Sequence, residues 1–105
     1  MRVRVDGDGT ASVLDPDDLG RFAVEVPEGL DLGVVGAALA GRVRFDSAEL
    51  AWVDQAWLRA TGGFDTAERA GGFTAMVAAA TKRGWVDRGS GDIAGHVHRI
   101  PGGAR

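Results

Sequence analysis

Apolar and polar residues alternate in short runs through the first part of the chain, and such alternation is typical of a strand with one buried face. Residues 2–5 read Arg-Val-Arg-Val, residues 6–9 read Asp-Gly-Asp-Gly, and residues 11–14 are again rich in apolar side chains. A strand, a turn-forming segment and a second strand in this order predict a β-hairpin. Val3 and Val5 are expected to face the core.

The next segments predict two more strands and two helical elements. Phe22 to Val26 alternates in the same way and predicts a strand that ends at Pro27. Residues 42–45 predict another short strand. Asp31 is a suitable N-cap for a helix that follows it, and residues 15–18 (Asp-Pro-Asp-Asp) predict one short helical turn.

Residues 49–60 fit two interpretations. Leu50, Val53 and Trp57 are spaced as one stripe of a continuous helix, whereas residues 50–53 followed by Asp54 fit a strand that leads into a short capped helix. We favour the strand followed by the helix. A longer helix is predicted from about residue 65 to residue 83, with Phe73 on its buried face.

The end of the chain predicts a second hairpin. Residues 85–87 and 93–100 are strand-like and are separated by the turn-forming Gly89-Ser90-Gly91. The whole pattern predicts a single α+β domain over residues 1–100, with a largely antiparallel sheet, about three helices packed on one face, and this C-terminal β-hairpin. Residues 101–105 are expected to form a flexible tail.

Composition narrows the function classes. The chain has 105 residues, of which 45% are hydrophobic and 26% charged, and it contains no cysteine. It therefore cannot form disulfides or thiolate-ligated metal sites. It has no long apolar run and no secretory signal, so we expect a cytoplasmic protein with no membrane partner. The net charge of −3 argues against nucleic acid as a partner.

The turn in the first hairpin carries a recognisable motif. Asp6-Gly7-Asp8-Gly9-Thr10 follows an apolar strand and resembles the DxDxT loop of the haloacid-dehalogenase-type phosphatases over these five positions. That resemblance implies Asp6 as nucleophile and Asp8 as general acid. Here the loop leads into another strand instead of a helix. We therefore expect a tight hairpin turn in which glycine supplies a positive φ.

The only two histidines, His96 and His98, are two positions apart on a predicted strand. Both imidazoles would then project from the same side of the sheet and could serve as catalytic bases or as two metal ligands. Asp87 is the candidate third group. It shares their face if the last hairpin has a two-residue loop, and it leaves that face if the loop has three residues. The sequence does not decide between these registers.

Three tryptophans are many for a chain of this length, and they serve cores and binding pockets alike. Trp52, Trp57 and Trp85 are therefore candidate ligand-binding residues. Asp54 and Arg59 are candidates for the polar rim of the same site.

A second resemblance concerns residues 80–88 and 92–98, which are similar to the end of the recognition helix and the wing of winged-helix regulators. It implies binding to duplex DNA. The helix before this segment carries Ala75, Met76, Ala78 and Ala79 where base contacts would need polar side chains.

Our leading hypothesis is a binding or accessory module for a small molecule or a protein partner, without a tightly held cofactor. The alternative is a small isomerase, cyclase or hydrolase that uses the histidine pair, with or without a metal. The winged-helix regulator is a third hypothesis, and a homodimer is left open.

Overall fold

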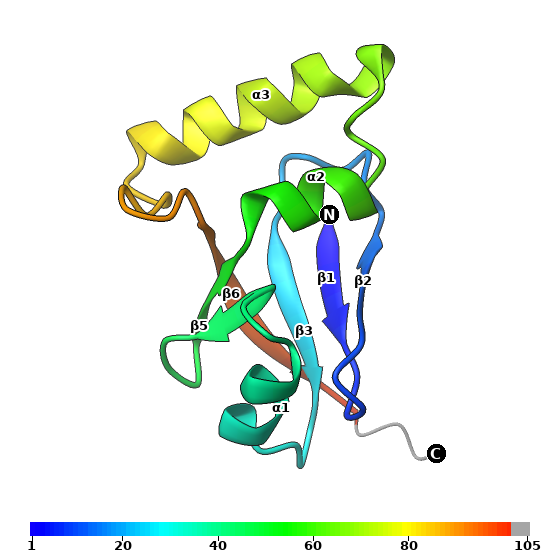
Figure 1. The fold of residues 1–105 in the computed structure, drawn as a ribbon, viewed down its shortest axis with the longest axis vertical. Coiled ribbons are helices and arrows are strands. Elements are labelled where there is room, and N and C mark those ends of the chain that lie inside the picture. Colours follow the sequence, from blue (N-terminus) through cyan, green and yellow to red (C-terminus); the bar gives the residue numbers. More distant parts are fainter. Residues whose placement is uncertain (102–105) are drawn as a thin grey trace.

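The computed structural model describes residues 1–101, which form six strands and three helices (Figure 1). Residues 102–105, most of the predicted tail, lie outside the described residues. In chain order the elements are β1 (Arg2–Val5), β2 (Ala11–Leu14), β3 (Ala23–Pro27), α1 (Leu32–Ala38), β4 (Val43–Phe45), β5 (Leu50–Val53), α2 (Gln55–Thr61), α3 (Ala67–Lys82) and β6 (Ile93–Ile100). Within residues 1–101, no helix combines the length and the apolar character that crossing a membrane requires.

All six strands belong to one mixed sheet with the order β2-β1-β3-β6-β5-β4. Strand pairs β1/β2, β4/β5 and β5/β6 are antiparallel, as predicted for the sheet as a whole. Pairs β1/β3 and β3/β6 are parallel, which the local pattern did not predict. The connection through α1 returns the chain from the end of β3 to the other end of the sheet, where β4 starts. The antiparallel steps from β4 to β5 and from β5 to β6 then leave β6 parallel to β3.

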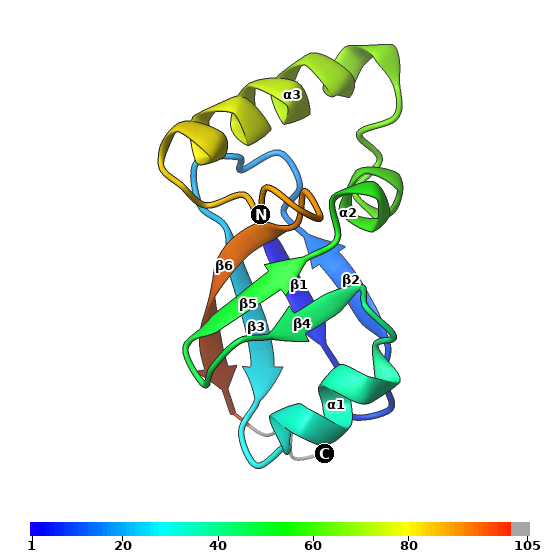
Figure 2. The ribbon, with the colours of Figure 1, turned by 60° about the vertical axis from the view of Figure 1, so that its left-hand side comes forward.

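The prediction that about three helices pack on one face of the sheet is not met. The sheet is curled, α1 lies at one end of it, and α2 and α3 lie at the other end (Figures 1 and 2). Strongly twisted short strands can curl in this way, and the inner face of the sheet then covers itself. The helices are left to close the two ends of the core.

The inner face of the curled sheet holds the hydrophobic core. Val3 and Val5 of β1 are fully buried, which confirms the predicted orientation of the first hairpin. The helices add large side chains from both ends of the sheet. The fully buried members of the core with the largest volumes are Phe64, Phe73, Met1, Leu39, Leu58, Val3, Val5, Val24, Val26, Val43 and Val53.

Two aspartates start the short helices as the sequence predicts. The Asp31 carboxylate accepts hydrogen bonds from the backbone N–H groups of Gly33 (2.8 Å) and Val34 (3.1 Å). Asp54 accepts one from the Trp57 N–H at 2.8 Å. These bonds satisfy donors that have no partner inside the helix. The second cap also shows that residues 49–60 form a strand followed by a helix.

Residues 15–18 form a turn and not the predicted helical turn. The Asp18 N–H donates to the Asp15 carbonyl at 3.0 Å, and Asp15 has a φ of +48°, outside the range of a right-handed helix. The Asp15 carboxylate lies 2.6 Å from the guanidinium of Arg2. This ion pair places Asp15 at the end of β2 instead of at the start of a helix.

The predicted C-terminal hairpin is present only as a remnant. Val86 and Ile93 form an isolated antiparallel bridge, and Gly91 N–H donates to the Asp87 carbonyl at 2.7 Å across the loop. Along most of its length β6 pairs instead with β5 and β3. A long central strand gains two ladders of hydrogen bonds in this position, whereas a hairpin with three residues would provide one short ladder.

Candidate functional site

The outer face of the sheet carries the polar and aromatic side chains that the core excludes. Cross-strand partners project from the same side of a sheet. The register pairs His98 with Glu25, and it pairs His96 with both Ala23 and Leu50. Both histidines lie on this outer face and are exposed. The two imidazoles therefore project from the same side of the sheet, as predicted.

The structure does not bring Asp87 to the histidines. The Val86–Ile93 bridge places Asp87 opposite Asp92, with residues 88–91 as the loop, so Asp87 does share the histidine face. However, Asp92 lies four positions before His96, which is about 13 Å along a strand. The Asp87 carboxylate accepts a hydrogen bond from the Gly89 N–H at 2.9 Å. That bond is the main reason why the pKa of Asp87 is lowered.

The histidine pair also lacks the further ligands of a metal centre. Within residues 1–101, no three histidine or carboxylate side chains are grouped so that they could hold a metal ion. Two imidazoles alone do not make a stable metal site.

Two of the three tryptophans lie on the outer face, one on each side of Ala94. Trp52 is the cross-strand partner of Ala94, and the Ala94 N–H donates to the carbonyl of Trp85 at 2.8 Å on its other side. Trp52 and Trp85 thus flank Ala94, and their backbones are about two strand spacings, roughly 9.5 Å, apart. Trp85 is 46% exposed and Trp52 is partly buried. We call Trp52, Ala94 and Trp85 the tryptophan patch.

Two arginines lie beside the tryptophan patch. The Arg83 guanidinium lies over the Trp85 ring, 5.2 Å from its centroid. Arg44 is the cross-strand partner of Trp52. Its guanidinium lies 2.9 Å from a carboxylate oxygen of Asp92 and 3.4 Å from one of Asp87. Asp92 is only 5% exposed, whereas the Arg44 and Asp87 side chains of this network are more exposed.

A second ion-pair network lies on the same face, over β1 and β3. The Glu25 carboxylate lies 2.8 Å from the Arg4 guanidinium and 3.2 Å from that of Arg2. Burial alone would raise the pKa of Glu25, but the hydrogen bonds from Arg4 and Arg2 outweigh it and leave the pKa lowered. Sequence reasoning did not single out these residues. The alternation that buries Val3 and Val5 already places Arg2 and Arg4 together on the opposite face.

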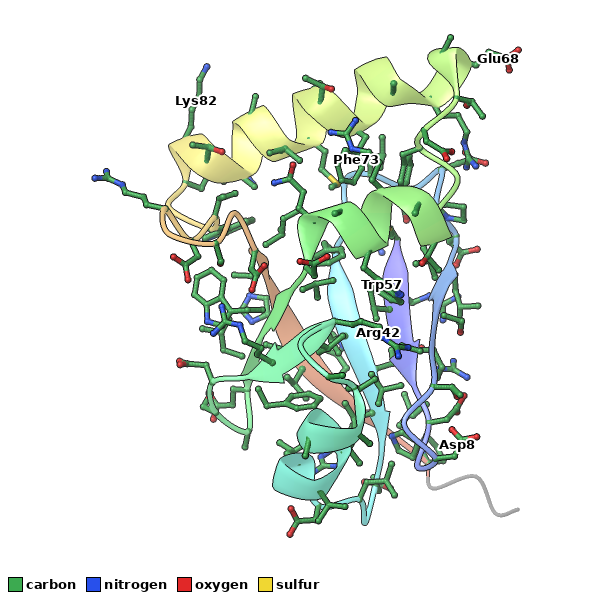
Figure 3. All side chains as sticks on the ribbon, in the orientation of Figure 1. Asp8, Arg42, Trp57, Glu68, Phe73 and Lys82 are labelled. Atoms are coloured by element: carbon green, nitrogen blue, oxygen red, sulfur yellow. The ribbon has the colours of Figure 1, made fainter. Side chains whose placement is uncertain are left out.

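The remaining predicted site residues lie elsewhere. Trp57 is partly buried against the core below α2 (Figure 3). Asp54 and Arg59 line a separate hollow of about 410 Å³ between the start of α2 and the loop before β6, together with Gln55, Ala56, Ser90 and Gly91. The Arg59 guanidinium packs over the Phe73 ring at 4.9 Å. The single tryptophan site with a polar rim that the sequence suggested is therefore divided between two places.

The DxDxT-like loop is a hairpin turn with internal hydrogen bonds, and Asp8 lies at its tip (Figure 3). The Asp6 N–H donates to the Thr10 carbonyl at 2.9 Å, and the Thr10 hydroxyl donates to Asp8 at 2.7 Å. The latter bond is the main cause of the lowered pKa of Asp8. Gly9 has the predicted positive φ of +86°.

The segment that resembles a wing has a different place in the fold. Residues 93–100 form β6, a central strand of the sheet between β3 and β5. Comparison of the chain with protein-family models, with curated proteins and with solved structures gave no significant match.

Proposed function

We propose that this domain is a binding module that docks a segment of a partner protein on the tryptophan patch. The observation that carries the proposal is the position of Trp52 and Trp85 on either side of Ala94, on the sheet face that faces away from the core. Tryptophan and arginine are the side chains that most often dominate the binding energy of protein interfaces. Both types meet here, since Arg83 and Arg44 border the patch.

The patch is built on rigid elements, which favours binding because little order must be created when a partner arrives. Trp52 lies in β5, which has a strand on each side. The backbone of Trp85 is held by two hydrogen bonds. Its carbonyl accepts from the Ala94 N–H, and its backbone N–H donates to the Ala80 carbonyl at 2.9 Å. The ion pairs of Arg44 with Asp92 and Asp87 lie beside the patch.

The enzymatic alternative receives less support. It needs an acid that is free to act beside the histidine pair. The carboxylate of Asp87 is engaged by Gly89 and Arg44, and that of Glu25, the cross-strand partner of His98, is engaged by Arg2 and Arg4. The hollows that we find along α1 and α2 are lined by other residues than His96 and His98.

A random peptide library displayed on phage tests the proposal directly. Peptides selected on the intact domain should bind it with saturable affinity and should lose roughly tenfold or more in affinity for Trp85→Ala. The matched control is Val34→Ala, because Val34 is 69% exposed but lies on α1, at the far end of the sheet. Circular dichroism establishes that both variants are folded. Selected peptides that bind Trp85→Ala as well as the wild type would contradict the proposal, and so would a library that yields no binder.

A further inference from the structure

We infer that the open edge of β2 binds a basic, extended segment of a partner protein, which adds to the sheet as a further strand. This edge is separate from the tryptophan patch, because three strands lie between β2 and β5 in the sheet. The inference therefore goes beyond the proposed function and does not depend on it. It is carried by four unpaired backbone groups of β2, by the uncharged side chains of that strand, and by the aspartates at its two ends.

The register of the first hairpin shows which backbone groups of β2 are free. The Asp6 N–H donates to the Thr10 carbonyl at 2.9 Å, and these two residues continue the β1/β2 register. Hydrogen-bonded and non-bonded pairs alternate along an antiparallel ladder, so the even-numbered residues of β2 bond to β1. The N–H and C=O groups of Ala11 and Val13 therefore point away from β1, toward the open edge.

These four groups are available to a second chain. No hydrogen bond joins them to α2, which lies near β2, or to any other part of residues 1–101. Among the described strands, β2 has β1 as its only neighbour (Figure 1). Ala11 and Val13 are partly exposed. An extended peptide presents its own N–H and C=O groups at the matching spacing, and proteins commonly bind such peptides at an open sheet edge.

β2 carries none of the residues that usually protect a sheet edge. Natural edges are guarded by charged side chains, prolines or bulges, or they are covered by a helix. Residues 11–14 read Ala-Ser-Val-Leu and pair with β1 without a bulge. The opposite edge differs, since β4 has only three residues with Arg44 in the middle, Val43 is fully buried, and α1 packs beside Phe45. Of the two edges, β2 is therefore the one open to a strand.

Charge at the two ends of β2 determines which kind of segment fits. Residues 6–18 contain five aspartates and no lysine or arginine. Two of these aspartates pair with arginines at 2.6 Å, and the other three have no ion-pair partner within residues 1–101. The three are Asp6 and Asp8 in the hairpin turn and Asp18 beyond the end of the strand. Lysine or arginine at both ends of an added strand neutralises these charges, whereas acidic residues there are repelled.

The same charge argues against a second copy of this chain as the occupant. Two β2 strands that pair antiparallel about Ser12 would place their free backbone groups opposite each other. That pairing brings the aspartates that follow one strand beside those that precede the other. Because like charges destabilise adjacent strands, a basic partner is favoured over self-association.

Hydrogen exchange measured by NMR on the full chain tests the free edge itself. The amides of Ala11 and Val13 should exchange much faster than those of Ser12 and Leu14, which are bonded to β1. Binding of a peptide should then slow exchange at Ala11 and Val13. Equal protection of all four amides in the unbound domain would overturn the inference.

The probe for binding is a blocked peptide with two lysines at each end of a short alternating valine–threonine segment. Calorimetry should show saturable binding that weakens as the salt concentration rises. Two control peptides should bind at least roughly tenfold more weakly, because each lacks one of the two required features. One has the same lysines on a Gly-Ser segment, and the other has glutamates in place of the lysines.

Variants of Val13 test the contribution of the backbone. Val13→Pro removes an N–H at the edge without removing a hydrogen bond to β1, and it should weaken binding roughly tenfold or more. Val13→Ala is the matched control, because it also shortens the side chain but keeps the N–H, and its affinity should stay within about twofold of the wild type. Circular dichroism establishes whether both variants are folded.

N-methylation of the peptide at alternate residues gives a test that needs no variant of the domain. Only one of the two alternating sets of peptide N–H groups faces β2, so one methylated peptide should lose binding and the other should keep it. The inference is wrong if both methylated peptides bind equally, if the Gly-Ser peptide binds as tightly as the valine–threonine peptide, or if folded Val13→Pro binds like the wild type. A dimer of the chain that Val13→Pro dissociates would make a second copy the occupant and overturn the basic partner. None of these results involves Trp85, so failure here leaves the proposed function untouched.

Discussion

Replacing Gly9 by alanine should destabilise this domain far more than the same change at another glycine with a similar backbone. Gly9 has a φ of +86°, and a Cβ placed on it would lie 2.7 Å from the Cβ of Ala38 and 3.3 Å from its carbonyl oxygen. Gly29 is the matched control, because its φ is +90° but a Cβ there meets nothing within 4 Å.

The magnitude can be assembled from these contacts. A left-handed backbone conformation destabilises an alanine by about 1–2 kcal/mol. The lower conformational entropy of the unfolded variant offsets about 0.4–1 kcal/mol of this loss. Gly29→Ala should therefore lose about 1 kcal/mol of unfolding free energy. At Gly9 the forced overlap with Ala38 adds about 1–3 kcal/mol, for a total of about 2–4 kcal/mol. In a domain of this size that loss lowers the Tm by roughly 10–20 °C.

Urea denaturation followed by circular dichroism measures both variants. A double-mutant cycle with Ala38→Gly isolates the contact, since removing the Ala38 methyl should relieve the overlap and give a coupling energy of about 1 kcal/mol or more. The reasoning is refuted if Gly9→Ala and Gly29→Ala cost the same within about 0.5 kcal/mol, or if the cycle shows no coupling.

Three further changes test the outer-face networks and the packing of α3. Asp92→Ala should lower the unfolding free energy by about 1–3 kcal/mol in urea denaturation, because it removes the buried carboxylate that accepts from Arg44. Asp87→Ala should lower it less, and equal losses would contradict the difference in burial. Glu25→Gln should make the unfolding free energy depend less on pH in the acidic range. The pKa of Glu25 is lower in the folded chain, so the unfolded chain binds the proton first as the pH falls. The stabilisation by ionised Glu25 is therefore complete above about pH 5 and disappears as the pH falls through the folded pKa. An unchanged pH profile of the unfolding free energy would refute this. Phe73→Ala should cost about 3–5 kcal/mol, since the ring is fully buried beneath α3, and a loss below about 1 kcal/mol would mean that α3 is not docked as described.

Features that depend on neighbours in the sequence were predicted well. The alternation in residues 2–5 placed Val3 and Val5 in the core, and the caps at Asp31 and Asp54 marked the starts of α1 and α2. Strand and helix periodicity, and the hydrogen bond of a capping side chain, involve residues only a few positions apart. Local sequence is sufficient to specify them.

The candidate site was predicted only in part for the opposite reason. The sequence pointed to Trp52, Trp85 and Asp87, but nothing local indicated that Trp52 and Trp85 lie on either side of one alanine. It left open whether Asp87 shares the face of the histidines, and the structure, with a loop over residues 88–91, places Asp87 on that face but beside Asp92.

The sequence by itself determined most strand and helix segments and which side of each strand is apolar, because these follow from short-range periodicity and capping. Only the tertiary structure decided that β6 lies between β3 and β5, that the sheet curls, and that two tryptophans 33 positions apart share its outer face. Strand order depends on contacts between distant segments. The chain entropy that is lost when these segments come together must be offset by the apolar area buried in the whole core. No short stretch of neighbouring residues determines that difference.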